Sequence, residues 1–61
     1  MRFIFSGIYG FIMDYSWYYD RELEIDTWCL DALGYQPREG MALTFRQESD
    51  KMWFMLRWNN D

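Results

Sequence analysis

The chain has 61 residues, a net charge of −4, one cysteine and no histidine. A single cysteine excludes an internal disulfide, and without histidine or a cysteine cluster a zinc site is not expected. The negative charge is opposite in sign to what a free nucleic-acid-binding protein needs. We therefore expect one small domain, residues 1–61, whose core depends on the aromatic residues that make up 23% of the sequence.

The first segment, RFIFSGIYGFIM, is rich in β-branched and aromatic residues, which favours strand. Gly7 and Gly10 would mark a bend or bulge. The segment predicts an N-terminal strand or, if the chain folds back, a hairpin in which residues 3–7 pair with residues 15–19. It lacks the small-residue cleavage motif of a signal peptide, and no segment reaches the roughly 18 apolar residues of a membrane span. We therefore expect a cytoplasmic protein with a reduced thiol and no membrane contact.

A helix is expected over about residues 20–33. Asp20 is a candidate N-cap, and Gly34, with Pro37 shortly after it, is a candidate C-terminal stop. Between these ends, apolar residues recur at helical spacing and define a buried face. The residues of this face are Ile25, Trp28, Cys29, Ala32 and Leu33. A buried thiol is usually inert, so Cys29 is not expected to be catalytic.

The same region carries most of the negative charge. Residues 14–31 hold six acidic residues and one basic residue, and the rest of the chain sums to +1. Glu22, Glu24 and Asp26 form a candidate partner-binding face, because an acidic surface can dock on a basic surface of another protein. The alternative is a solvated helix face that keeps an apolar protein soluble. No further ligand set accompanies these carboxylates, so a metal site is not expected here.

The stretch MALTF predicts a strand over about residues 41–46, with alternate side chains on the core face: Met41, Leu43 and Phe45. The stretch SDKMWFMLRW that follows fits two structures. As a strand it would form a hairpin with residues 41–46 and bury Met52, Phe54, Leu56 and Trp58. None of the residues 51–58 is β-branched, however, which favours a C-terminal helix over about residues 49–58.

If residues 49–58 form a helix, Ser49 is its expected N-cap, and Met52, Met55 and Leu56 form its expected buried stripe. The large aromatic residues of this helix cannot all be buried together with that stripe. Tryptophan is the residue most often found at interface hot spots. The candidate partner-binding residues of this segment are therefore Trp53, Phe54 and Trp58.

Three stretches follow one another in this order: DTWCLDALG, a helix ending in glycine; the strand ALTF; and the acidic turn RQESD leading into KMWFMLRW. This pattern, over roughly residues 20–58, resembles small accessory proteins of large lytic tailed bacteriophages, of the early, host-takeover type. The resemblance implies a protein of the bacterial host cytoplasm that binds and blocks a host enzyme or a defence system. The N-terminal third of the chain is not part of it.

The sequence contains no nucleophile motif, phosphate loop or dinucleotide fingerprint. We therefore expect an α+β domain without cofactor or enzymatic activity, acting as a protein-binding module. With the resemblance, this predicts an inhibitor or modulator of a bacterial host or anti-phage defence protein that acts by occluding a functional surface. The alternative is a small structural or assembly protein that self-associates through its aromatic faces, for example as a homodimer.

Overall fold

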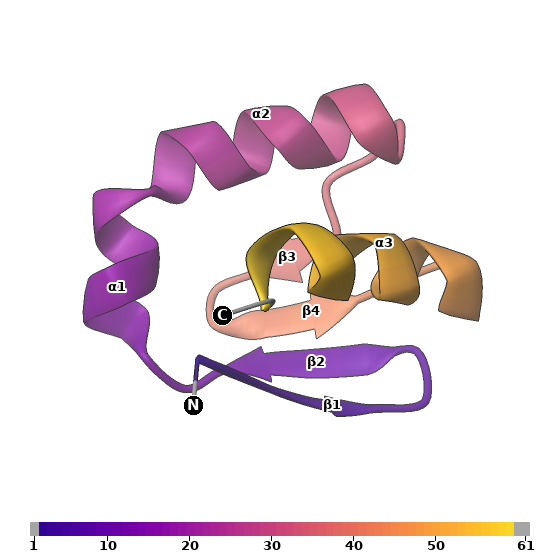
Figure 1. Ribbon diagram of the computed structural model, residues 1–61, viewed down its shortest axis with the longest axis horizontal. Helices are drawn as coiled ribbons and strands as arrows, with labels where there is room; N and C mark the ends of the chain where they lie inside the picture. Colours follow the sequence, from indigo (N-terminus) through magenta and orange to yellow (C-terminus); the bar gives the residue numbers. More distant parts are fainter. Residues whose placement is uncertain (1, 60–61) are drawn as a thin grey trace.

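The computed structural model describes residues 2–59 and combines a four-stranded antiparallel sheet with three helices (Figure 1). This confirms the α+β class expected from the sequence. No helix of the described residues is long and apolar enough to cross a membrane. In chain order the elements are β1 Phe3–Ser6, β2 Tyr9–Ile12, α1 Tyr15–Asp20, α2 Glu22–Ala32, β3 Arg38–Glu39, β4 Ala42–Thr44 and α3 Glu48–Trp58.

The N-terminal hairpin is tighter than the sequence predicted. Strands β1 and β2 pair antiparallel down to Ser6 and Tyr9, so only Gly7 and Ile8 form the turn. Gly7 has a φ of 61°, whereas Ile8, like every described residue other than glycine, has no positive φ. This combination matches a type II′ turn, whose first central position favours glycine. The expectation that Gly7 marks a bend is confirmed.

Residues 15–19, expected to complete the hairpin as a strand, belong to helix α1 instead, so their predicted pairing with residues 3–7 is wrong. The aromatic content of DYSWYYD favours strand, but aromatic residues stabilise a strand only where a neighbouring strand can pair with them. Asp14 starts the helix as its N-cap: its carboxylate accepts a hydrogen bond of 3.1 Å from the Trp17 backbone N–H. The buried Tyr18 then holds α1 against the core.

The helix expected over residues 20–33 is present as α2, with a different start. Asp20 ends α1 and is not the N-cap of α2, whose N-cap position is Arg21. The end is as predicted: Gly34 has a φ of 82°, and its N–H donates to the carbonyl of Leu30. Of the expected buried face, two residues are fully buried, Ile25 and Cys29, and three are partly buried, Trp28, Ala32 and Leu33.

The sheet has the strand order β1-β2-β4-β3, so the predicted strand at 41–46 lies inside it as β4. Leu43 and Phe45 are buried as predicted, but Met41 lies in the turn before the strand and is exposed. Gly10 in β2 stands opposite Phe5 and opposite Leu43. A Cβ at Gly10 would lie 3.0 Å from the Phe5 ring, so glycine lets this ring lie against the sheet.

The C-terminal segment is a helix, α3, as predicted, but the prediction of its buried face is wrong. Phe54 and Trp58 are buried, whereas Met52 and Leu56 are exposed. The N-cap is Gln47 and not Ser49. The helix is apolar on two sides. The buried side carries two aromatic rings, Phe54 and Trp58, and the exposed side carries one, Trp53; aromatic side chains remove large areas from water when they are buried.

Phe54 lies at the centre of the core. Its ring centroid is 5.2 Å from that of Phe3, 5.5 Å from Phe45 and 6.2 Å from Trp28. These partners come from β1, from the segment after β4 and from α2, so one side chain joins the sheet to two helices. Accordingly, α3 lies between α2 and the β1–β2 hairpin in Figure 1.

Candidate functional site

The solvent-facing side of α3 is apolar. Met52, Trp53 and Leu56 are 54%, 56% and 68% exposed. At 100° per residue they lie within an arc of about 100°, on the side opposite Phe54. A single exposed apolar side chain is ordinary, whereas a group of them on one side of a helix is a candidate contact surface. We refer to Met52, Trp53 and Leu56 as the α3 outer face.

The structure separates the three candidate aromatic residues of this helix. Trp53 lies at the surface, as expected for a partner-binding residue. Phe54 and Trp58 are buried, and the ring of Trp58 packs edge-on against Trp28 of α2 at a centroid distance of 6.2 Å. The expectation that Phe54 and Trp58 lie at the surface is therefore wrong, because the core needs their rings. A partner touching α3 meets Trp53 alone among the three.

Two of the three candidate acidic residues are bound within the molecule. Arg38 of β3 contacts Glu22 at 2.9 Å and holds both carboxylate oxygens of Asp26, at 3.0 Å and 3.2 Å. The hydrogen bond to Asp26 raises the pKa of Arg38 further. Tyr18 donates a hydrogen bond of 2.9 Å to the same Asp26 carboxylate. These contacts join α1, α2 and β3, so Glu22 and Asp26 act first as a structural link.

Glu24, the third candidate, points to solvent. Its carboxylate lies 3.9 Å from Arg57 of α3, and both side chains are exposed. Such a pair contributes at most about 1 kcal/mol to stability. Arg57 also stacks on the ring of Trp58, at 4.0 Å from the ring centroid. The pair therefore places opposite charges beside the Trp53 edge of the α3 outer face, where a polar rim would surround an apolar contact.

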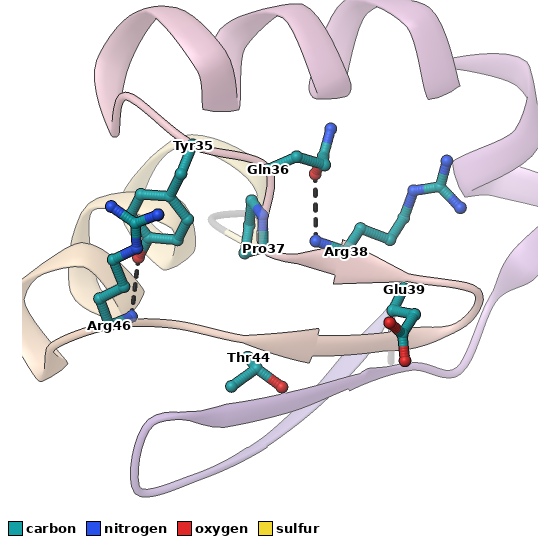
Figure 2. A pocket seen from close by; sticks show the side chains of 7 residues that line it. All are labelled: Tyr35, Gln36, Pro37, Arg38, Glu39, Thr44 and Arg46. Carbon is teal, nitrogen blue, oxygen red and sulfur yellow. Dashed lines mark hydrogen bonds between the residues drawn. The ribbon is translucent and has the colours of Figure 1, made fainter.

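A hollow of about 380 Å³ lies at the β3 edge of the sheet. Arg46 stacks on the ring of Tyr35, whose hydroxyl donates to Asp50 and accepts from the Arg46 backbone N–H. Figure 2 shows Arg38 turned toward α2 and Glu39 turned to the other side of the strand, so the polar groups do not converge as a small-molecule site requires. The lining residues are Tyr35, Gln36, Pro37, Arg38, Glu39, Thr44 and Arg46.

Cys29 is almost fully buried in α2, and burial raises the pKa of its thiol to about 12. The thiol therefore stays protonated near neutral pH, where only a thiolate would be reactive. Within residues 2–59, no group of three or more histidine, cysteine or acidic residues is arranged to hold a metal ion.

No family model, curated protein or solved structure matches this chain. The candidate site is accordingly defined by its surface chemistry: the apolar α3 outer face, with Glu24 and Arg57 at its rim. Sequence reasoning missed two of its members, Met52 and Leu56, by assigning them to the core. The signal that could have found them is the number of rings on each side, since Phe54 and Trp58 share the side of the helix opposite Met52 and Leu56.

Proposed function

We propose that this protein is a non-enzymatic protein-binding module that contacts its partner through the α3 outer face. The observation that carries the proposal is the exposure of Met52, Trp53 and Leu56 together on one side of a helix. Leaving a large apolar side chain in water forgoes about 1.5–3 kcal/mol that burial would provide. A hydrophobic groove that accepts a helix face recovers this energy. Leu56 follows Trp53 by three residues and Met52 by four, and these are spacings of the anchors that such a groove accepts.

The charges next to this face suggest how the partner is oriented. Glu24 and Arg57 form an exposed pair at its Trp53 edge. Rim charges of this kind contribute to association rate and register more than to affinity. Glu22 and Asp26 contribute less to recognition than the sequence suggested, because Arg38 already neutralises part of their charge.

The resemblance of residues 20–58 to phage accessory proteins supports a bacterial host protein or an anti-phage defence protein as the partner. Binding in the host cytoplasm would then inhibit or modulate that protein by covering a functional surface. An occluding protein needs a rigid contact surface and no catalytic group. The α3 outer face lies on a helix whose other side is fixed in the core by Phe54 and Trp58, which gives it that rigidity.

The proposal is tested by capturing proteins from a bacterial lysate on the immobilised chain. The test variant is Trp53→Ala with Leu56→Ala, and the control is Leu23→Ala, an even more exposed apolar residue on α2. Losing a tryptophan hot spot costs about 2 kcal/mol or more, which weakens binding about 30-fold. We expect the wild type and the control to retain the same protein and the test variant to lose it. Equal capture by all three, with unchanged folding, would contradict the proposal.

A further inference from the structure

A second exposed apolar surface lies on the opposite side of the molecule. Phe3, Ile12 and Leu43 point into the core, so by strand alternation their neighbours point away from the helices. This outward side shows no covering element among residues 2–59, since its large side chains are about half exposed. We refer to it as the open sheet face, and its residues are Ile4, Ser6, Tyr9, Phe11, Ala42 and Thr44.

The strand register arranges this face in two rows. Ile4 stands beside Phe11, and Phe11 beside Ala42, which makes an apolar row across β1, β2 and β4. Ser6, Tyr9 and Thr44 form a parallel row of hydroxyl-bearing side chains. Neither row contains a charged residue.

The only charged strand residue on this side is Glu39, in the edge strand β3. It pairs with Ala42 of β4. Figure 2 shows both Glu39 and Thr44 on the side of the sheet that faces away from α2. The centre of the face therefore offers nothing that would select a strongly charged partner. It does suit a second copy of this chain: two molecules of net charge −4 repel each other least where both surfaces are uncharged.

We infer that the open sheet face is the contact between two copies of this chain, related by a two-fold axis. The same uncharged patch on both copies satisfies the requirement of a two-fold interface that each surface complement itself. The two sheets would pack about 10 Å apart, as in sandwich proteins, with layers in the order helix, sheet, sheet, helix.

The available area limits the size of this contact. The molecule measures 26 × 23 × 22 Å across its Cα positions. One face of a body this size presents on the order of 500 Å², so two copies bury on the order of 1,000 Å², the lower end for a specific interface. The dimer should therefore dissociate on dilution. Because α3 packs on the other side of each sheet, such a dimer carries its two α3 outer faces on opposite sides and can bind two partner molecules.

The inference is tested on the purified chain without any partner, so its outcome is separate from that of the proposed function. Sedimentation equilibrium from about 1 µM to about 500 µM spans the dissociation constants of weak dimers. We expect the mass to rise from 7.6 kDa toward twice that value with increasing concentration. A wild-type chain that stays at 7.6 kDa over the whole range would overturn the inference.

Variants then locate the contact. Phe11→Lys and Ile4→Lys should each keep the chain monomeric at every concentration, whereas the control Leu56→Lys on α3 should dimerise like the wild type. Far-UV circular dichroism checks that each variant folds, and Phe11→Ser and Ile4→Ser replace any lysine variant that does not. A dimer that survives both open-face changes, or one that Leu56→Lys abolishes, would place the contact elsewhere and refute the assignment.

Discussion

Replacing Phe54 by alanine tests the structure at its most connected point. The ring is fully buried and lies against Phe3, Phe45 and Trp28, at centroid distances between 5.2 and 6.2 Å. Truncating a buried phenylalanine costs about 3–5 kcal/mol, from the lost transfer energy and the cavity left behind. A domain of 61 residues has a total stability of about 3–9 kcal/mol. Phe54→Ala should therefore lose at least about a third of the free energy of unfolding, and all of it if the total lies at the lower end of that range.

The assay is thermal and urea unfolding followed by far-UV circular dichroism. For a domain of this size, 1 kcal/mol corresponds to about 4–8 °C in Tm, so Phe54→Ala should melt at least about 12 °C lower or be unfolded at 25 °C. The matched control is Leu56→Ala, two residues along the same helix but 68% exposed. It should change the stability by no more than about 0.5 kcal/mol.

This pair of variants separates the observed orientation of α3 from the one that the sequence suggested. With Met52, Met55 and Leu56 as the buried stripe, Leu56→Ala would be the damaging change and Phe54→Ala the mild one. A large loss of stability for Leu56→Ala together with a small one for Phe54→Ala would refute the orientation of α3, and with it the α3 outer face.

Three further predictions concern other parts of the fold. Gly10→Ala should cost about 1–3 kcal/mol, because its Cβ would displace the ring opposite it, and an unchanged urea midpoint would show that this ring yields freely. Arg38→Met should cost about 1–3 kcal/mol, since it leaves the part-buried carboxylates of Glu22 and Asp26 without their cation. Glu24→Gln, in the exposed pair with Arg57, should cost less than about 1 kcal/mol. Equal effects of the two variants on Tm would contradict the structural role of Arg38. Burial raises the pKa of Cys29 from 9.0 to about 12, and burial and a hydrogen bond to Asp26 raise the pKa of Tyr18. The folded chain thus keeps protons that the unfolded chain releases, so stability should fall as the pH rises above about 9, and Cys29→Ala should reduce this dependence; a urea midpoint that stays constant from pH 7 to about pH 11 would refute it.

Local signals in the sequence identified several elements correctly. Gly34 follows the end of α2 with a left-handed backbone conformation, which glycine adopts more readily than any other residue, so a glycine after a helical pattern predicts the helix end. Leu43 and Phe45 were assigned to the core from strand alternation, which depends only on the pleat. The helical state of residues 49–58 followed from the absence of β-branched residues. Each of these features depends on neighbours in the chain, so it can be read from the sequence.

The features that the sequence did not yield depend on contacts between distant segments. Which side of α3 is buried is decided by rings from β1, α2 and the segment after β4, which meet Phe54 only in the folded protein. The pairing of Glu22 and Asp26 with Arg38 likewise requires β3 to lie beside α2. Helix α1 was not predicted, because the aromatic residues that follow Asp14 favour strand.

The central claim is that the α3 outer face binds a partner protein, and an affinity measurement tests it most directly. Once capture identifies the partner, isothermal titration of that purified protein with wild type, Trp53→Ala and Leu23→Ala gives three dissociation constants under one condition. Trp53 is exposed and takes no part in the buried core, so its loss should leave Tm unchanged. The account predicts that Trp53→Ala binds at least about 30-fold more weakly while Leu23→Ala binds like the wild type. A dissociation constant for Trp53→Ala within twofold of the wild-type value, at unchanged Tm, would contradict it.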